Sequence, residues 1–145
     1  MSDQSSSSLQ DPADQNKLLI RKMFRDVLEK DSFDEAVIVR YFSPSYIQHA
    51  DGKTLDFAGF VDHVRELKRI VTNLRFTFEH MLAEGDKVMD IHRVEGKKRS
   101  GGKIAVRLFS LWIIKDGKIV LCDELSHVVA GSPEDRDLGS RTSKR

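Results

Sequence analysis

The chain has 145 residues, 39% of them hydrophobic, and its 24 Lys and Arg nearly balance 23 Asp and Glu for a net charge of +1. This length suits one globular domain with a core of its own, and the small net charge gives no electrostatic reason to expect a nucleic acid or membrane partner. Cys122 is the only cysteine, which excludes an intrachain disulfide and a cysteine zinc cluster.

Polar segments flank the region that is expected to fold. Residues 1–13 are serine-rich and residues 131–145 are similarly polar, so both are expected to remain flexible tails. The N-terminus lacks the apolar stretch of a signal peptide, and no apolar run approaches the roughly 20 residues of a membrane span. These features predict a cytoplasmic protein with one folded domain over residues 14–130.

Helical periodicity marks the chain from Asp14 to Lys30, where apolar residues recur three and four positions apart. A second, shorter helix is predicted after Ser32, because Ser32 and Glu35 have the spacing of a capping box. Pro44 is expected to end that helix, since a proline cannot continue it.

A third helix is predicted after a brief extended segment at residues 45–49. Thr54 is its expected N-cap, and apolar residues from Phe57 to Val71 line one face.

After Asn73 the apolar pattern changes to strict alternation, which predicts strands. The short turns between these strands require antiparallel neighbours. Helices followed by a meander predict an α+β fold, in which N-terminal helices pack on a curved antiparallel sheet to form a cone with an internal pocket. Such a pocket suits a small apolar ligand. The expected strands cover about residues 74–79, 87–95, 103–115 and 118–129.

The turn at residues 116–117 decides which of two neighbouring acids enters this pocket, because Asp123 and Glu124 point to opposite faces of one strand. A two-residue turn would pair Ser110 with Asp123. A three-residue turn with a left-handed glycine would instead place Ser110 and Glu124 on one face. Both alternatives are open from the residues alone.

Three stretches of the sequence are similar to a known family: YFSPSYIQHADG (41–52), AEGDKV (83–88) and LWIIKDGKIV (111–120). In order and spacing they resemble the SnoaL-like group of the nuclear-transport-factor-two-like superfamily, over about residues 14–128. The resemblance implies a cone-shaped α+β fold and a homodimer that pairs through the outer face of the sheet. Relatives include cyclases, epoxide hydrolases, dehydratases, isomerases and plain binding proteins, so the fold does not fix a reaction.

The resemblance also implies positions for site residues. The family's Tyr-x-x-His falls on Tyr46 and His49, and its pocket-facing aspartate falls on Glu124. His49 near the pocket mouth, with its ring turned toward the cavity, would exchange protons; the alternative is a histidine that only hydrogen-bonds its turn. Glu124 buried against Trp112 would have the raised pKa of a general acid or base; the alternative is a solvated or salt-bridged acid. We therefore expect His49 and Glu124 to be catalytic, Tyr46 to donate a hydrogen bond and Trp112 to pack the ligand.

The preceding strand departs from the family pattern. Ser110 and Ile113 stand where relatives often carry an acid and an arginine, so a catalytic acid–arginine arrangement is absent there and Ser110 is expected to contact the ligand. Asp90 and His92 share one face of a strand and are further candidate ligand-binding residues, with a polar pair on the outer face as the alternative.

The remaining candidate residues are not expected to take part in chemistry in the pocket. Cys122 is expected to be a small buried hydrophobe and the basic cluster 97–99 a solvated hairpin tip. His127 is expected to be a surface residue, with a place at the pocket mouth as the alternative. His63 and His80 carry no signal beyond their local pattern. No histidine spacing indicates a metal site, and no nucleotide or phosphate motif indicates a cofactor.

Together these features predict a small-molecule-pocket protein, acting as a cofactor-free acid–base enzyme on an apolar polyketide-, steroid- or terpenoid-like substrate. Isomerase, cyclase, dehydratase and epoxide hydrolase activities are all compatible with it. The alternative is a non-catalytic ligand-binding or dimerisation module of the same fold.

Overall fold

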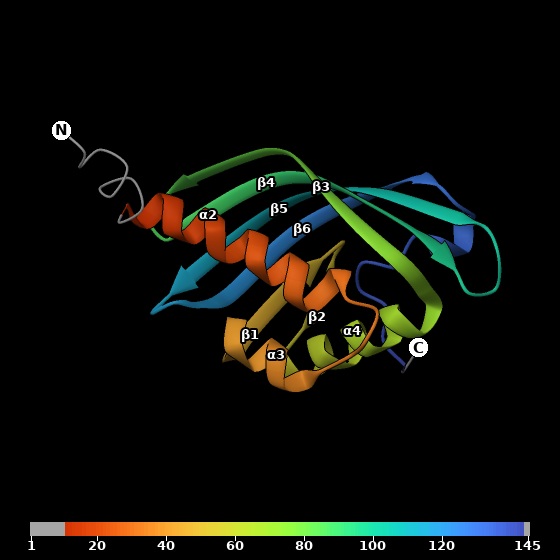
Figure 1. The fold of residues 1–145 in the computed structure, drawn as a ribbon, viewed down its shortest axis with the longest axis horizontal. Helices are drawn as coiled ribbons and strands as arrows, with labels where there is room; N and C mark the ends of the chain where they lie inside the picture. The colour runs from red at the N-terminus through yellow and green to blue at the C-terminus, as the bar shows by residue number, and fades with distance from the viewer. Residues whose placement is uncertain (1–10, 144–145) are drawn as a thin grey trace.

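The computed structural model describes residues 11–143 of the chain as three α-helices on one side of a six-stranded sheet (Figure 1). The helical elements are α2 (Pro12–Met23), the π-helix η1 (Phe24–Glu29), α3 (Glu35–Tyr41), α4 (Phe57–Ile70) and the short 3-10 helix η2 (Pro133–Asp135). The strands are β1 (Phe42–Ala50), β2 (Lys53–Leu55), β3 (Val71–Glu84), β4 (Lys87–Lys98), β5 (Lys103–Lys115) and β6 (Lys118–Ala130). The predicted α+β cone is confirmed. No helix in this described part is long and apolar enough to cross a membrane.

The helices begin at aspartates rather than at the predicted hydroxyl residues. Asp11, Asp34 and Asp56 are the N-caps of α2, α3 and α4, and each carboxylate accepts a hydrogen bond from a backbone N–H of the first turn. The predictions of Ser32 and Thr54 as caps are therefore wrong. A carboxylate satisfies the exposed N–H groups and also interacts favourably with the positive end of the helix dipole.

The segment predicted as brief at residues 45–49 is part of the nine-residue strand β1. Pro44 lies within β1, between the paired residues Phe42 and Ile47, where the ladder to β6 changes register. A proline is tolerated there because its missing N–H falls in a part of the strand that makes no regular ladder bond.

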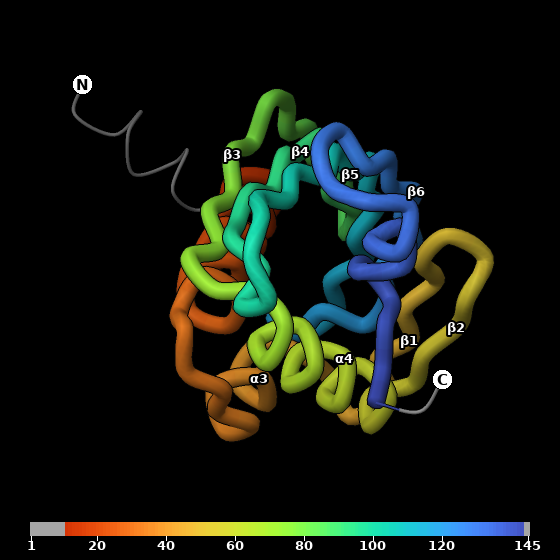
Figure 2. Tube along the Cα trace, turned by 90° about the vertical axis from the view of Figure 1, so that its right-hand side faces the viewer, coloured from red at the N-terminus to blue at the C-terminus, as the bar shows by residue number. Residues whose placement is uncertain are grey.

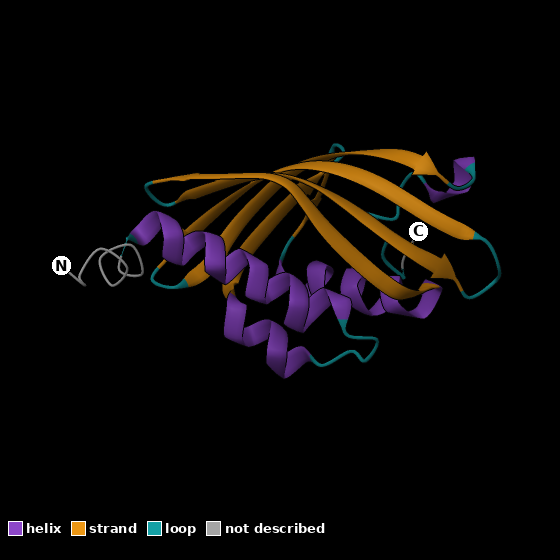
Figure 3. Cartoon of the chain, turned by 45° about the horizontal axis from the view of Figure 1, so that its top comes forward, coloured by secondary structure: helices purple, strands orange, loops and turns teal. Residues whose placement is uncertain are grey.

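The sheet has the strand order β2-β1-β6-β5-β4-β3. Strands β3 to β6 form the predicted antiparallel meander, but β1 runs parallel to β6, so the sheet is mixed rather than wholly antiparallel. The parallel pair is possible because α4 and four strands separate β1 from β6 in sequence, which supplies the long crossover that a tight turn cannot. Figure 3 shows the helices along the concave side of this curved sheet.

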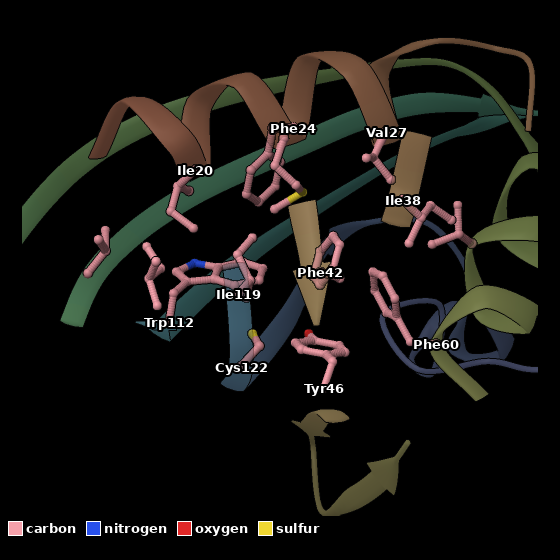
Figure 4. Close-up of a cluster of buried hydrophobic side chains, with 14 of the residues drawn as sticks. Ile20, Phe24, Val27, Ile38, Phe42, Tyr46, Phe60, Trp112, Ile119 and Cys122 are labelled. Atoms are coloured by element: carbon pink, nitrogen blue, oxygen red, sulfur yellow. The ribbon is translucent and has the colours of Figure 1, made fainter. Parts of the chain in front are cut away.

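The main core lies between these helices and the sheet (Figure 4). Phe24, 3% exposed, stands at its centre. Its ring contacts Phe76, Phe78, His92 and Trp112 at centroid distances of 4.9 to 5.7 Å, all edge-on. Edge-to-face packing of this kind is the favourable arrangement for aromatic rings, and it joins the end of the first helix to β3, β4 and β5.

The β5–β6 hairpin combines features of both predicted alternatives. Its turn at residues 116–117 has two residues, with positive φ angles of 51° and 73°, yet Ser110 pairs with Glu124 and not with Asp123. Val120 has no partner at the register shift in β6, and this extra residue acts as a β-bulge that reverses the facing of everything after it. Glu124 therefore faces the interior and Asp123 the solvent, as the family register implied.

The C-terminal segment 131–145, predicted to be a flexible tail, is packed against the domain over residues 132–143. Residues 132–143 fold back from β6 to the side of α4 (Figure 2), and Leu138 is 5% exposed. A buried ion pair joins Lys98 Nζ to Asp135 Oδ2 at 3.0 Å, so the basic cluster 97–99 is partly structural. At the other end, α2 begins at Pro12, and residues 1–10 and 144–145 of the two predicted tails lie outside the described residues.

Gly96 of β4 is expected to be intolerant of a side chain. A Cβ there would lie 2.6 Å from Val71 Cγ1 and 3.2 Å from the Thr72 carbonyl oxygen, and Val71 is buried and cannot move aside. Gly96→Ala should lower the free energy of unfolding by about 1–3 kcal/mol, measured by urea denaturation. Gly139→Ala, where the nearest atom to a new Cβ is 3.9 Å away, is the matched control. Equal stability of the two variants would contradict the close approach.

Candidate functional site

A cavity of about 80 Å³ lies inside the cone, between the sheet, α4 and the C-terminal segment. Its walls are mostly apolar, and four polar side chains reach it from four different elements. A few convergent polar groups in an apolar cavity are typical of a small-molecule site. These polar side chains are Gln48 of β1, His63 of α4, His92 of β4 and Glu124 of β6.

Asp90 and His92 form a buried pair on the inner face of β4, with exposed fractions of 3% and 2%. His92 Nδ1 lies 2.5 Å from one oxygen of Asp90, and Trp112 Nε1 donates to the other at 2.8 Å. The outer-face alternative is wrong, because the face of β4 that Asp90 and His92 share is the one packed against the interior. An ionised carboxylate only accepts, so whenever the His92 ring is neutral its proton lies on Nδ1 and Nε2 keeps a lone pair.

Glu124 lies in the same cross-sheet row as Asp90 and Ser110 and is 9% exposed. The Ser110 hydroxyl donates to Glu124 Oε2 at 3.2 Å. Burial raises the pKa of Glu124 to about 7, while His92 and the Ser110 hydrogen bond oppose the rise. A carboxyl group with this pKa is present in both protonation states near neutral pH, so it can donate or accept a proton.

Tyr46 supports the site from behind. It is completely buried, and its hydroxyl donates to Gln48 Oε1 at 2.8 Å. Burial raises the pKa of Tyr46 well above its usual value, with Cys122 and Glu124 adding to the effect. Gln48, and not Tyr46, lines the cavity. The sequence analysis did not single out Gln48, although its position two residues after Tyr46 places both side chains on the same face of the strand.

His49 lies on the other face of β1. Its Nδ1 is 3.0 Å from Thr54 Oγ1 on β2, and it stands outside the residues that line the cavity. The expectation that its ring faces the cavity is wrong, because Tyr46, Gln48 and Ala50 occupy the buried positions of this strand and alternation sends His49 outward.

His63 is a second residue that sequence reasoning missed. It is 5% exposed, and its Nδ1 is 2.9 Å from the Arg141 carbonyl oxygen, which makes Nδ1 the donor. Burial lowers the pKa of His63, which favours the neutral ring. Its place on the apolar face of α4, between Phe60 and Val64, was the available signal.

The other candidates take no part in the cavity. Cys122 is buried as predicted, and burial raises the pKa of its thiol well above the usual value. His80 and His127 are exposed. Within residues 11–143, no three His, Cys, Asp or Glu side chains come together in a way that could hold a metal ion.

Known proteins share this sequence pattern and this fold. Residues 20–122 match the SnoaL-like domain, and an uncharacterized protein of Schizosaccharomyces pombe is 29% identical over 83% of this chain and 92% of its own length. A proposed SnoaL-like polyketide cyclase from Jannaschia sp. CCS1 has a TM-score of 0.69 at 16% identity, covering 80% of this chain and 88% of that one. An M. tuberculosis LEH-like epoxide hydrolase has a TM-score of 0.67 at 9% identity, covering 79% and 84%. At these identities the two structures show the fold alone.

The raised pKa of Glu124 predicts a pH dependence of stability. The unfolded chain releases this proton near pH 4.5 and the folded chain near pH 7, so between these values the folded state binds more protons and stability falls as pH rises. Over this window the fall is at most about 3 kcal/mol.

Glu124→Gln cannot ionise and keeps an oxygen for Ser110, so it should remove this part of the pH dependence. Its free energy of unfolding, measured in urea from pH 4.5 to 8, should rise relative to wild type as pH increases. Glu84→Gln, at an exposed position, is the control. Parallel curves for wild type and Glu124→Gln would show that Glu124 ionises normally in the folded chain.

Proposed function

The chain belongs to the SnoaL-like domain family, and from this premise we propose that its cavity binds a small apolar molecule with a carbonyl group and transfers protons on it without a cofactor. His92 is the base and Glu124 is the acid. The observation that carries this proposal is the presence of both groups in one apolar cavity, with an environment that suits each to its role.

The proposed step is proton abstraction beside the carbonyl. His92 Nε2 takes the proton from the carbon next to the carbonyl, and the electron pair of the broken C–H bond forms a carbon–carbon double bond. The carbonyl oxygen then gains negative charge and takes the proton of Glu124. Return of a proton to another carbon would complete an isomerisation, and attack by the enol carbon on a second carbonyl would complete a cyclisation.

The surrounding residues support these roles. The carboxylate of Asp90 holds His92 in the tautomer that a base requires and stabilises the imidazolium that forms, and Trp112 orients that carboxylate through its 2.8 Å hydrogen bond. Apolar walls exclude water, which strengthens these electrostatic interactions.

The cavity volume restricts the ligand. About 80 Å³ is more than the roughly 10–15 Å³ that one water needs and less than the roughly 150 Å³ of a cavity that binds benzene. The structure as it stands thus favours a compact ketone over the steroid- or polyketide-sized molecules that the sequence suggested. The non-catalytic alternative predicts binding of the same ketone without proton exchange.

Deuterium uptake by cyclopentanone in D₂O, followed by proton NMR, tests the proposed reaction. Wild-type protein should accelerate uptake beside the carbonyl, and His92→Asn and Glu124→Gln should each slow it by about 10²–10⁴-fold, the usual contribution of a general acid or base. His49→Ala, which alters a histidine outside the cavity, should stay within about twofold of wild type. Binding of cyclopentanone without accelerated uptake would favour the non-catalytic alternative, and equal rates for all variants would contradict the assigned roles.

We also propose that a second copy of the chain covers the outer face of the sheet. Leu82, Met89, Phe109 and Leu125 are 47% to 74% exposed there, and they pair as cross-strand neighbours: Leu82 with Met89, and Phe109 with Leu125. Nearby charges are neutralised in pairs, as between Arg107 and Glu79. An apolar, locally neutral face does not repel its own copy, and exposed patches of this kind are typical of interfaces.

Leu125→Glu should therefore convert a dimer to a monomer, because it places a charge on the apolar face beside Phe109. Light scattering after size-exclusion chromatography measures the mass. Val39→Glu, at a residue that is 48% exposed on α3 and so away from the sheet, should remain a dimer. A wild-type mass of about 16.5 kDa, that of one chain, would contradict the proposed pairing.

A further inference from the structure

The C-terminal segment 132–143 contributes to the cavity as well as to the fold. Gly131, with φ of 144°, turns the chain out of β6, and the segment then runs down to α4 (Figure 2). Leu138 and Gly139 both line the cavity. A segment that the composition predicted to be a loose tail thus forms one wall of the site.

Leu138 supplies the apolar part of this wall. Its side chain is buried in the second core cluster, against residues of β3, β5 and the end of α4. Shortening this side chain would therefore enlarge the cavity on the side of the wall, since Leu138 is the only residue of 132–143 that lines it with a side chain.

Gly139 supplies the space in front of the acid. A Cβ at this position would lie 3.9 Å from Glu124 Oε1 and 4.0 Å from Leu108 Cδ2. A methyl group fits there without strain, but a larger side chain would occupy the volume beside the Glu124 carboxyl group. The missing side chain at residue 139 thus leaves room for a ligand at the proton donor.

Two polar residues of the cavity fasten this wall. Gln48 Nε2 donates to the Gly139 carbonyl at 3.3 Å, and His63 Nδ1 to the Arg141 carbonyl at 2.9 Å. Outside the cavity, the buried Lys98–Asp135 ion pair and the hydrogen bonds from Ser143 to Asp62 hold the two ends. The wall is therefore held at defined points on three elements, β1, β4 and α4.

We infer that Leu138 and Gly139 are specificity-determining residues, which limit the ligand to a compact molecule and position its polar group at Glu124. This inference rests on the proposed function of the cavity. In a well-packed site, one methylene group changes affinity by about 10–200-fold, so changes at these two residues should reorder a series of ligands that differ only in ring size.

The test uses the full chain and cyclic ketones from cyclopentanone to cyclooctanone, with dissociation constants from isothermal titration calorimetry. Wild type should bind the smallest ring most tightly. Leu138→Ala should move the tightest binding to a larger ring, and Gly139→Val should weaken binding of every ring by at least about tenfold. Leu138→Val is a milder truncation should Leu138→Ala not fold, and Arg136→Ala, at an exposed position of the same segment, should match wild type.

The outcomes separate this inference from the proposed function. Ketone binding with the same ring preference and affinity in wild type and in both the Leu138 and Gly139 variants would overturn the inference and leave the proposed function standing. If no ketone binds wild type, the proposed function fails, and benzene then tests the wall alone. Benzene bound by Leu138→Ala and not by wild type would support the inference that Leu138 limits the size of the cavity. Benzene bound by neither protein would overturn that inference.

Discussion

The burial of two carboxyl groups, Asp90 and Glu124, is the constraint on which the rest of this structure depends. A carboxylate in an apolar interior is costly unless it is paired, hydrogen-bonded or protonated. The protein meets that cost differently at the two positions. Asp90 has a partner on each oxygen, His92 and Trp112. Glu124 has hydrogen bonds on Oε2 alone, from the Ser110 hydroxyl and the Cys122 thiol, and its pKa is raised to about 7. Two acids in one row of the sheet therefore have different environments: Asp90 is hydrogen-bonded through both oxygens, and burial favours the protonated form of Glu124.

The sheet makes this row possible through an irregularity rather than through a regular ladder. The bulge at Val120 shifts β6 by one residue, and without it Asp123 would occupy the interior in place of Glu124. The parallel pairing of β1 with β6 then places Gln48 beside this row. Register, which leaves no chemical motif in the sequence, thus determines which acid lines the cavity.

Much of the fold could be predicted from the sequence, and the reasons are local. The meander follows from alternation of apolar residues and from short turns, and the three main helices follow from helical periodicity. Predictions failed where two local signals competed. Aspartates cap the helices where hydroxyl residues are expected. Pro44 predicts the end of a helix followed by a brief extended segment, whereas it lies within the nine-residue strand β1. The polar composition of residues 132–143 predicts a flexible tail. The burial of Leu138 depends on neighbours far away in sequence, which composition does not show.

The candidate site divides in the same way. The sequence by itself determined that Asp90 and His92 share a face of their strand and that Asp123 and Glu124 do not, because side chains alternate along a strand. It also indicated that Cys122 is buried, because a free cysteine is most often a small buried residue. Only the tertiary structure decided which face is the inner one. It turned His49 outward, brought Gln48 and His63 to the cavity, and closed one wall with Gly139. These outcomes depend on contacts between elements distant in sequence, and no local period encodes which elements will meet.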